Sequence, residues 1–375
     1  MKPERKCRVL LLGPSLQAVS GVSTHLGLLF GSFLSTGFEL LHFQVGSEGR
    51  AESRLQKLWR FAASPFHFSA ALLRHKPDVV HLNTSLEPKS YWRDLIYLLL
   101  AKLVGRKVVY QVHGGALLQD FFPRSRLLTG LLRGALRLPD AVVLLADIEL
   151  RAYRQFVPEA RLVVIANAIE TADLVDAPLA LMAEAPLHLA YLGRLAENKG
   201  IFDIVAALCL LRNRNIRVRV SIAGGGPDEA RLRQAVESAG MQDMVHFWGP
   251  LFGPEKNALW KAADVFVFPT YHREGLPYAL LEAMAAGAVP VTCPVGAIPD
   301  VMADGVHGLF VNPQAPEALA AALERLDRDR PLLFRLAAAS RLRVQEHYTV
   351  ERLADDFDQL YRSLQGPSCA ASPAI

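Results

Sequence analysis

Residues 264–291 read DVFVFPTYHREGLPYALLEAMAAGAVPV, and this stretch carries the strongest indication of the fold. Its apolar opening, 264–269, predicts a buried strand that ends at a proline. Gly275 and Pro277 then open a helix, since proline has the fixed φ of a first helical turn and apolar residues follow at helical spacing. Gly287 ends this helix, because glycine tolerates a positive φ. The stretch therefore predicts a strand, loop and helix of the kind that builds parallel α/β sheets.

Two glutamates, Glu274 and Glu282, flank the start of this helix and are separated by seven residues. A helix N-terminus binds anions, because its first N–H groups have no partner within the helix. Carboxylates on either side of a bound diphosphate would accept hydrogen bonds from hydroxyls, those of a sugar at one end and of a ribose at the other. The plain alternative is that Glu274 caps the helix and Glu282 is a surface residue.

The whole phrase resembles the motif of retaining glycosyltransferases of family four, the glycosyl transferases group 1. The resemblance implies the GT-B fold, an α/β fold of two facing Rossmann-like domains with parallel sheets and a C-terminal helix that crosses back to the first domain. It also implies that Glu274 faces the donor sugar and that Glu282 binds the nucleotide ribose. Gly275, Leu276 and Pro277 would lie at the donor.

Composition fits such an architecture. The chain has 375 residues, of which 51% are hydrophobic and 21% charged, which is typical of a globular protein with room for two domains. Its longest apolar run, Leu95–Val104, is too short to span a bilayer, and the N-terminus lacks the apolar region of a signal peptide. Scattered cysteines argue against disulfides and zinc sites and for a reducing, cytoplasmic compartment. They are Cys7, Cys209, Cys293 and Cys369.

Charge is uneven along the chain. Residues 1–170 contain 22 Lys and Arg against 13 Asp and Glu, whereas the rest contains 19 against 24. A basic half can face nucleic acid, an anionic membrane or a lipid-linked phosphate. Two basic and apolar stretches, 50–76 and 116–138, favour lipid over nucleic acid. For the first stretch the alternative is an amphipathic helix packed on its own sheet, and Ser64-Pro65 predicts a break in it. The second stretch is the better membrane candidate, because it directly follows the His-Gly-Gly loop of residues 113–115.

Candidate ligand contacts follow three predicted strands of the first half. In an open parallel sheet the ligand crevice lies just past the carboxyl ends of the strands. Gly21 lies in a loop between a strand and a helix, and the resemblance makes this loop the glycine turn at the donor. Asn83 and Thr84 end the next such strand and are candidates for contact with the acceptor. His113 precedes two glycines that let a ligand approach, and it matches the family's His-Gly near the donor sugar.

Two loops of the second half complete the candidate site. Arg194 and Lys199 lie in the loop GRLAENKG, residues 193–200, and two such cations are usually solvated. This loop, however, resembles the family loop whose Arg and Lys hold the donor diphosphate. Fixed cations stabilise the charge that a departing nucleoside diphosphate gains. Gly224 and Gly225 belong to a Gly-Gly-Gly-Pro phrase that the resemblance also places beside the nucleotide.

The expected organisation has five parts. They are an N-terminal acceptor domain (1–170), a linker (171–186), a nucleotide-sugar-binding domain (187–348), a crossing helix (349–365) and a disordered tail (366–375).

The resemblance implies an enzyme that transfers a hexose-type sugar from a nucleotide-diphosphate sugar to a hydroxyl, with retention at the anomeric carbon. Glu274, His113, Arg194 and Lys199 are the catalytic candidates, and neither a metal nor a cofactor is expected. The acceptor would be a lipid-linked, polysaccharide or glycoconjugate intermediate, with anionic membrane but no nucleic acid as a partner. Two alternatives stay open: another GT-B enzyme such as a nucleotide-sugar epimerase, and a non-catalytic nucleotide-sugar-binding subunit.

Overall fold

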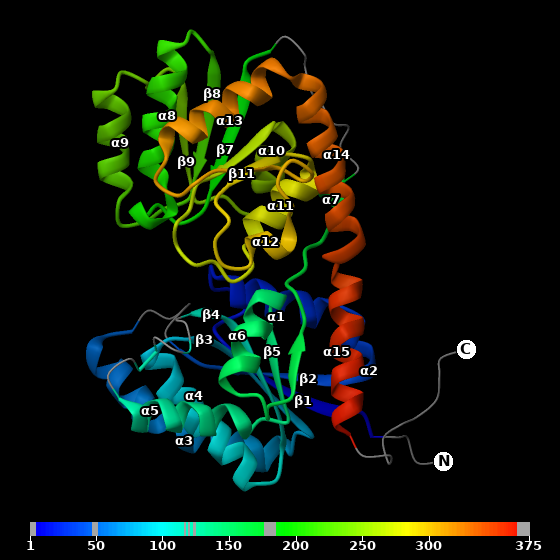
Figure 1. Ribbon diagram of the computed structural model, residues 1–375. Helices are drawn as coiled ribbons and strands as arrows, with labels where there is room; N and C mark the ends of the chain where they lie inside the picture. The colour runs from blue at the N-terminus through cyan, green and yellow to red at the C-terminus, as the bar shows by residue number, and fades with distance from the viewer. Residues whose placement is uncertain are drawn as a thin grey trace. The chain divides into compact units, whose positions relative to one another are not determined.

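The computed structural model describes residues 5–46, 52–115, 118, 121–122, 125–175 and 185–365. The chain divides into two compact units. Unit 1 comprises the residues up to Ala168 together with those from Val350, and unit 2 comprises Ile169–Thr349. Each unit contains a six-stranded parallel sheet flanked by helices (Figure 1).

The sheet of unit 1 has the strand order β2-β1-β3-β4-β5-β6. Its strands are β1 (Cys7–Gly13), β2 (Phe38–Gln44), β3 (Val79–Leu86), β4 (Lys107–Gly115), β5 (Ala141–Leu144) and β6 (Leu162–Val164). Its helices are α1 (Gly21–Gly31), α2 (Leu34–Gly37), α3 (Arg54–His75), α4 (Pro88–Leu103), α5 (Arg126–Arg137), α6 (Asp147–Phe156) and α15 (Val350–Leu364).

Both faces of this sheet are buried, as is usual for parallel strands. One core lies between the sheet and α3, α4, α5 and α6, and the other lies between the sheet and α1, α2 and α15. α15 follows unit 2 in the chain yet packs through Phe357 and Tyr361 into the second core of unit 1. Such packing is expected of a C-terminal helix that returns to the first domain.

The predicted break in the helix at Ser64-Pro65 is wrong, because α3 continues through Pro65. An interior proline removes one helical hydrogen bond and costs about 3 kcal/mol. Phe68 and Leu72 are fully buried on the sheet, and each contributes about 1.5–3 kcal/mol by burial. Ser69 also donates its hydroxyl to the carbonyl oxygen of Pro65 at 2.9 Å. Packing on the sheet therefore outweighs the missing backbone bond.

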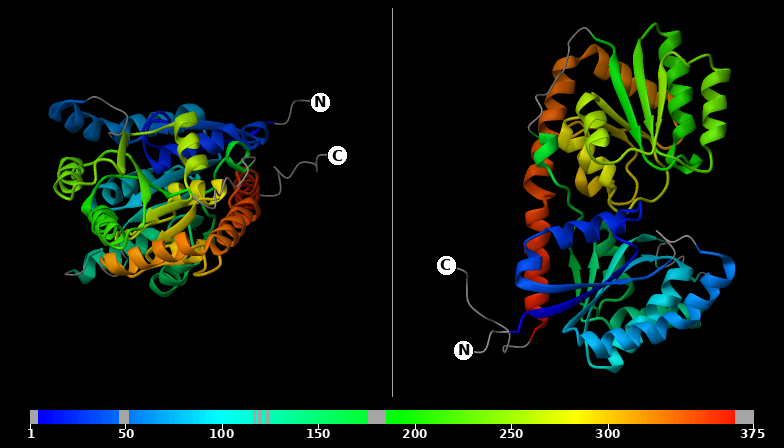
Figure 2. Two further views of the ribbon diagram at one scale, coloured as in Figure 1. Left: turned by 90° about the horizontal axis from the view of Figure 1, so that it is seen from above. Right: turned by 180° about the vertical axis from the view of Figure 1, so that it is seen from behind.

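The sheet of unit 2 has the order β12-β11-β10-β7-β8-β9 (Figures 1 and 2). Its strands are β7 (Leu187–Leu192), β8 (Val218–Ala223), β9 (Val245–Gly249), β10 (Val265–Phe268), β11 (Val289–Thr292) and β12 (Leu309–Phe310). Its helices are α7 (Ala172–Val175), the 3-10 turn η1 (Glu197–Lys199), α8 (Ile201–Asn213), α9 (Glu229–Ser238), α10 (Gly253–Ala262), α11 (Tyr278–Ala286), α12 (Ile298–Val301), α13 (Pro316–Arg328) and α14 (Arg330–His347).

The segment expected to be a linker, 171–186, contains α7, whose Leu174 is buried. The rest of this segment up to residue 184 lies outside the described residues, and so does the expected tail, 366–375. The boundary between the units falls at Ala168 and Ile169, two residues before the expected end of the first domain.

Candidate active site

Three loops of unit 2 are joined by backbone hydrogen bonds at the carboxyl ends of their strands. The N–H of Leu195, in the loop after β7, donates to the carbonyl oxygen of Gly225, in the loop after β8, at 3.0 Å. The N–H groups of Tyr271 and His272, after β10, donate to the carbonyl oxygen of Asn198 at 3.1 and 3.0 Å. The structure thereby brings together the predicted Arg-Lys loop, the glycine loop and the loop that carries Glu274.

Glycine is required where these loops approach one another most closely. Gly224 has a φ of +130°, and a Cβ there would collide with the carbonyl oxygen of Gly193. Gly200 has a φ of +73°, and a Cβ there would collide with the carbonyl oxygen of Pro269. Side chains at these positions would push the three loops apart. The glycines of both motifs are therefore needed for the shape of the site, whatever they contact in a ligand.

Lys199 and Glu274 form an ion pair inside this site. Nζ of Lys199 lies 2.5 Å from Oε1 of Glu274, and the two side chains are 16% and 12% exposed. The hydroxyl of Thr270 donates to the same carboxylate oxygen at 3.0 Å. Glu274 does not cap α11, since no side chain makes a capping hydrogen bond there. The carboxylate is instead held by a cation and a hydroxyl beside the helix.

Glu282, on the second turn of α11, is 7% exposed, so the alternative of a surface glutamate is wrong. Lys256 places its Nζ 2.6 Å from Oε1, and the indole N–H of Trp260 donates to Oε2 at 3.1 Å. The buried hydroxyl of Tyr278 lies near this carboxylate, and its pKa is raised by burial and by the charge of Glu282. Both oxygens of Glu282 are thus fixed by α10.

The start of α11 is open to an anion. The helix has no acidic residue in its first turn and no side-chain cap. Among the described residues, the N–H groups of Tyr278 and Ala279 have no hydrogen-bond acceptor. Arg194 is exposed and its guanidinium pairs with no described side chain, while its carbonyl oxygen accepts a hydrogen bond from Tyr191 at 2.8 Å. The loop after β7 thus presents an exposed cation, Arg194, and the uncapped N-terminus of α11 lies in the same unit.

A second polar cluster lies in unit 1. Every second side chain of β3 and β4 faces the core under α1 and α15. On this face Val79 and Val109 lie near the starts of the strands, and polar residues follow toward the strand ends. The polar residues are His81, Asn83, Gln111 and His113, with His25 of α1 packed against them. His113 Nε2 lies 2.8 Å from Oδ1 of Asn83, and Nδ1 of His81 lies 2.7 Å from the hydroxyl of Tyr361.

The three histidines of this cluster are neutral at pH 7. Burial lowers the pKa of His25 to about 4 and that of His81 to about 3. Burial also lowers the pKa of His113 well below its usual value, and positive charge on His25 or His81 would lower it further. With Asn83 accepting at Nε2, neutral His113 carries its proton there and leaves Nδ1 as an acceptor.

This cluster makes the stability of unit 1 depend on pH. The folded-state pKa values lie below the unfolded value of about 6.5, so the unfolded state binds more protons once the pH falls below 6.5. At pH 5 we expect His25 and His81 each to cost about 2 kcal/mol of unfolding free energy relative to pH 7.5. Hydrogen exchange, resolved by peptide, should show unit 1 opening more readily at pH 5, after correction for the intrinsic rate.

His25→Phe is the matched variant, because the ring of His25 packs edge-on against Phe357 and a phenyl ring can take its place without a titrating group. It should reduce the loss of unit 1 stability between pH 7.5 and pH 5. An unchanged loss would show that the pH dependence arises elsewhere.

Two further predicted residues are Thr84, which lies apart from these clusters, and Gly21, which lies at the start of a helix. Thr84 is buried on the opposite face of the sheet from Asn83, where its hydroxyl donates to Asp94 at 2.5 Å. Gly21 is the first residue of α1, next to the N-cap Ser20. The functional roles of Gly21, Asn83 and Thr84 stay predictions.

Among the described residues, no group of three His, Cys, Asp or Glu side chains is arranged to hold a metal ion. Of the two aspartates in the Asp-x-Asp sequence at 327–329, Asp327 pairs with Arg330, and Asp329 caps α14 by accepting from the N–H of Leu332.

Lys256 and Trp260 were not among the residues predicted from the sequence. They lie four residues apart on α10, so both face α11 from one side of that helix. The spacing was visible in the sequence, but the partner, Glu282, was identifiable only once α10 and α11 were packed together.

Family models match both units. Residues 29–168 match the model "Glycosyl transferase 4-like domain", and residues 186–329 match "Glycosyl transferases group 1". The chain is 32% identical over 180 residues to the putative colanic acid biosynthesis glycosyltransferase WcaL of Salmonella typhimurium, a match covering 46% of this chain and 42% of that protein. It is 31% identical over 204 residues to the D-inositol 3-phosphate glycosyltransferase of Corynebacterium aurimucosum, covering 51% and 48%. The match thus spans less than half the length of these relatives.

Solved structures share the fold over nearly the whole chain. Sucrose-phosphate synthase from Thermosynechococcus elongatus has a TM-score of 0.76 at 19% identity, covering 96% of this chain and 99% of that one. HepE of Anabaena, in complex with UDP-glucose, has a TM-score of 0.72 at 18% identity, covering 95% and 99%. The prediction of the GT-B fold is confirmed. With both family models matched along its two units, the chain belongs to the glycosyl transferases group 1 family.

Proposed function

We propose that the chain is a glycosyltransferase that moves a hexose-type sugar from a nucleotide-diphosphate sugar to a hydroxyl acceptor. One observation carries this proposal: unit 2 gathers two cations, an uncapped helix terminus and two nearly buried carboxylates around joined loops. These groups complement a molecule with a diphosphate in the middle and hydroxyl-bearing rings at both ends.

In this proposal the diphosphate binds at the start of α11, where the N–H groups of Tyr278 and Ala279 donate to it. Arg194 and Lys199 stabilise the negative charge that this diphosphate gains as the bond to the sugar breaks. These cations supply the positive charge that a divalent metal provides in other transferases, so the proposal needs neither a metal nor a cofactor. Glu274 accepts hydrogen bonds from the sugar, and Glu282 from the ribose.

Retention at the anomeric carbon is part of the proposal. A retaining enzyme with a covalent intermediate needs a free carboxylate nucleophile. Glu274 is engaged by Lys199 and Thr270, which suits an orienting role better than attack. The leaving phosphate then accepts the proton of the acceptor hydroxyl on the same face of the sugar. His113, neutral with Nδ1 as acceptor, would bind a sugar hydroxyl rather than an anion.

The acceptor is proposed to be a lipid-linked or polysaccharide intermediate. Relatives named for colanic acid and amylovoran biosynthesis support a role in polysaccharide assembly. The excess of Lys and Arg in residues 1–170 supports contact of unit 1 with anionic lipid, which would place the protein at the cytoplasmic face of a membrane.

A panel of UDP-, GDP- and ADP-sugars tests the function. One donor should stabilise the chain, by about 2.7 kcal/mol at a hundredfold excess over its dissociation constant. The melting temperature of the transition that contains unit 2 is the measurement, and UDP-sugars come first because solved neighbours hold UDP or UDP-glucose.

Turnover of the stabilising donor then separates the alternatives. A transferase releases nucleoside diphosphate when membrane extract supplies the acceptor and passes labelled sugar to that extract. An epimerase would release free sugar without an acceptor, and a binding subunit would show stabilisation without turnover. No stabilisation by any donor would contradict the proposal.

A further inference from the structure

α3 carries an apolar stripe that faces away from the core. Four exposed residues at spacings of four, seven and seven residues lie on one side of this helix. They are Leu55, Trp59, Phe66 and Leu73, with exposed fractions of 68–79%. Phe68 and Leu72, on another side, are buried against the sheet. The sequence left open that this helix only packs on the sheet of its own unit. Such packing accounts for the side of α3 that carries Phe68 and Leu72, but not for this stripe.

The neighbouring helices carry similar stripes. α4 exposes large apolar residues at spacings of four, three and four residues. α5 and its C-cap residue expose large apolar residues at spacings of four and seven. They are Trp92, Ile96, Leu99 and Leu103 on α4, and Leu127, Leu131 and Leu138 on α5. α3, α4 and α5 cover the same face of the sheet and lie along it in one layer (Figures 1 and 2). Twelve of the 22 exposed large hydrophobic side chains among the described residues belong to these three helices, so the exposure is concentrated there.

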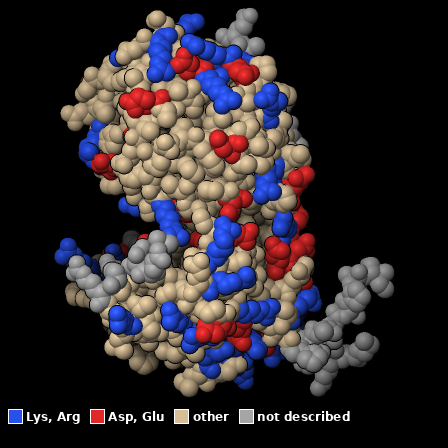
Figure 3. Space-filling view, viewed as in Figure 1, with Lys and Arg blue, Asp and Glu red and all other residues tan. Residues whose placement is uncertain are grey.

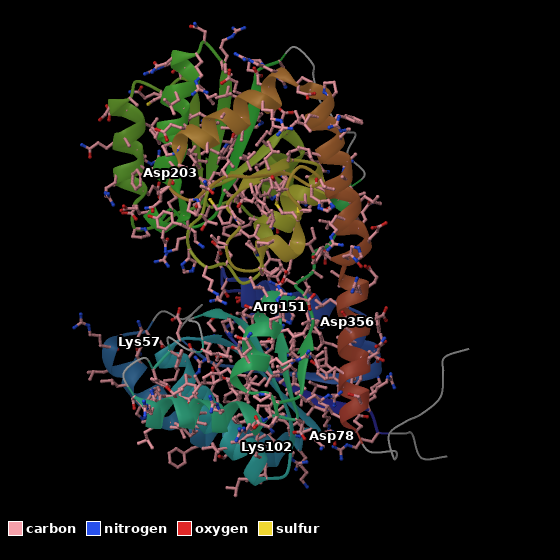
Figure 4. All side chains as sticks on the ribbon, in the orientation of Figure 1. Lys57, Asp78, Lys102, Arg151, Asp203 and Asp356 are labelled. Atoms are coloured by element: carbon pink, nitrogen blue, oxygen red, sulfur yellow. The ribbon has the colours of Figure 1, made fainter. Side chains whose placement is uncertain are left out.

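Charge on this layer has one sign. α3 and α5 contain no Asp or Glu, and the single acid of α4, Asp94, is buried and paired with Arg93. Exposed Lys and Arg side chains lie on α3 and α5, and Figure 3 shows the Lys and Arg, together with the Asp and Glu, that lie on one face of unit 1. The exposed cations include Arg54, Lys57 and Arg74 on α3 and Arg126 and Arg133 on α5, whereas Arg137 pairs with Glu159. Lys57 on α3 and Lys102 on α4 are labelled in Figure 4.

The charge of this face indicates what kind of partner binds to it. A second copy of the chain would bring an equally basic layer against it, and like charges disfavour that contact. Nucleic acid would match the charge but not the rows of leucine, phenylalanine and tryptophan. An anionic bilayer matches both, because helices in its interface bury apolar side chains while their Lys and Arg meet the headgroups. No helix among the described residues has the length and hydropathy of a bilayer-spanning segment.

We infer that the layer of α3, α4 and α5 is a docking surface that places unit 1 on an anionic lipid bilayer through the three apolar stripes. This rests on the proposed function for its purpose, the delivery of a lipid-linked acceptor. The docking itself depends on none of the donor-site residues. The inference identifies α3, α4 and α5 as the part of unit 1 that contacts the membrane. The face of the sheet that these helices cover is then turned toward the bilayer.

Co-sedimentation of the full chain with vesicles tests the inference. The chain should bind vesicles of phosphatidylglycerol with phosphatidylcholine and bind phosphatidylcholine alone about tenfold less. Trp59→Ser with Phe66→Ser should lower binding to the anionic vesicles at least tenfold. The matched control is Phe334→Ser with Leu342→Ser, which removes apolar side chains of α14 in unit 2 that are also about half exposed, at 50% and 54%, and should change nothing.

Lipids with brominated chains add a readout specific to the surface. They should quench the emission of Trp59 and Trp92, so the quenching should fall with Trp59→Phe and disappear when Trp92→Phe is added. The emission of Trp248, exposed in unit 2, should stay unchanged. The inference is overturned if the wild-type chain does not bind anionic vesicles, or if the α3 and α14 variants bind them equally well. It is also overturned if sedimentation shows self-association through α3 instead. Donor-induced stabilisation, measured on the same variants, should persist. Its absence from the wild-type chain would refute the proposed function and leave the docking result standing.

Discussion

Replacing Lys199 with methionine is expected to lower the rate of sugar transfer by about 10²–10³-fold. Lys199 is nearly buried and its Nζ lies in the site, 2.5 Å from Glu274, so its charge is poorly screened by water. A fixed cation of this kind stabilises a leaving diphosphate more than the bound donor, and its loss therefore acts mainly on kcat. Release of nucleoside diphosphate in the presence of membrane extract measures the effect.

Controls must separate chemistry from folding, because Lys199→Met leaves Glu274 unpaired in a nearly buried place. The double variant Lys199→Met with Glu274→Gln removes both charges and should recover thermal stability without recovering transfer. Arg328→Ala removes an exposed cation that pairs with Glu324 on α13 and should leave activity unchanged. Transfer by Lys199→Met within threefold of the wild-type rate would show that Lys199 does not stabilise the leaving group.

Glu274→Gln should lower kcat by at least about a hundredfold while the donor dissociation constant changes only a few-fold. The amide keeps the size of the side chain and one acceptor oxygen, so the loops around it should stay in place. What it loses is the charge that pairs with Lys199 and the strong acceptor for sugar hydroxyls. Isothermal titration of the donor, together with single-turnover transfer, gives the two constants separately.

Glu282→Gln is the natural comparison, since both acids flank the start of the same helix. Glu282 is held by Lys256 and Trp260 and is proposed to meet the ribose, far from the bond that breaks. Its replacement should weaken donor binding and leave kcat at saturating donor largely intact. Equal losses of kcat in the two variants would mean that Glu274 has no role specific to the reacting sugar.

Local signals in the sequence predicted the elements around the central motif well. Gly287 was expected to end α11 through a positive φ, and it does so at +85°. The final helix was predicted over 349–365, because its apolar period is regular and uninterrupted, and it is observed as Val350–Leu364. The crossing of this helix to the first unit came from the family resemblance, and its packing through Phe357 and Tyr361 agrees with that expectation.

Features that depend on tertiary packing were not predictable in the same way. Pro65 argued for a break in α3, but the burial of Phe68 and Leu72 maintains the helix. His25 had no local signal, since it enters its cluster from α1 while the other members come from β3 and β4. Glu282 could be assigned a role by resemblance, whereas its bonds to α10 depend on how two helices pack.

A crystal structure of the chain with its stabilising nucleoside diphosphate would show where the diphosphate binds. We expect diphosphate oxygens about 2.7–3.2 Å from the guanidinium of Arg194, from Nζ of Lys199 and from the N–H of Tyr278, with ribose hydroxyls at Glu282. A nucleotide bound elsewhere, with these groups left without contact to it, would contradict the account.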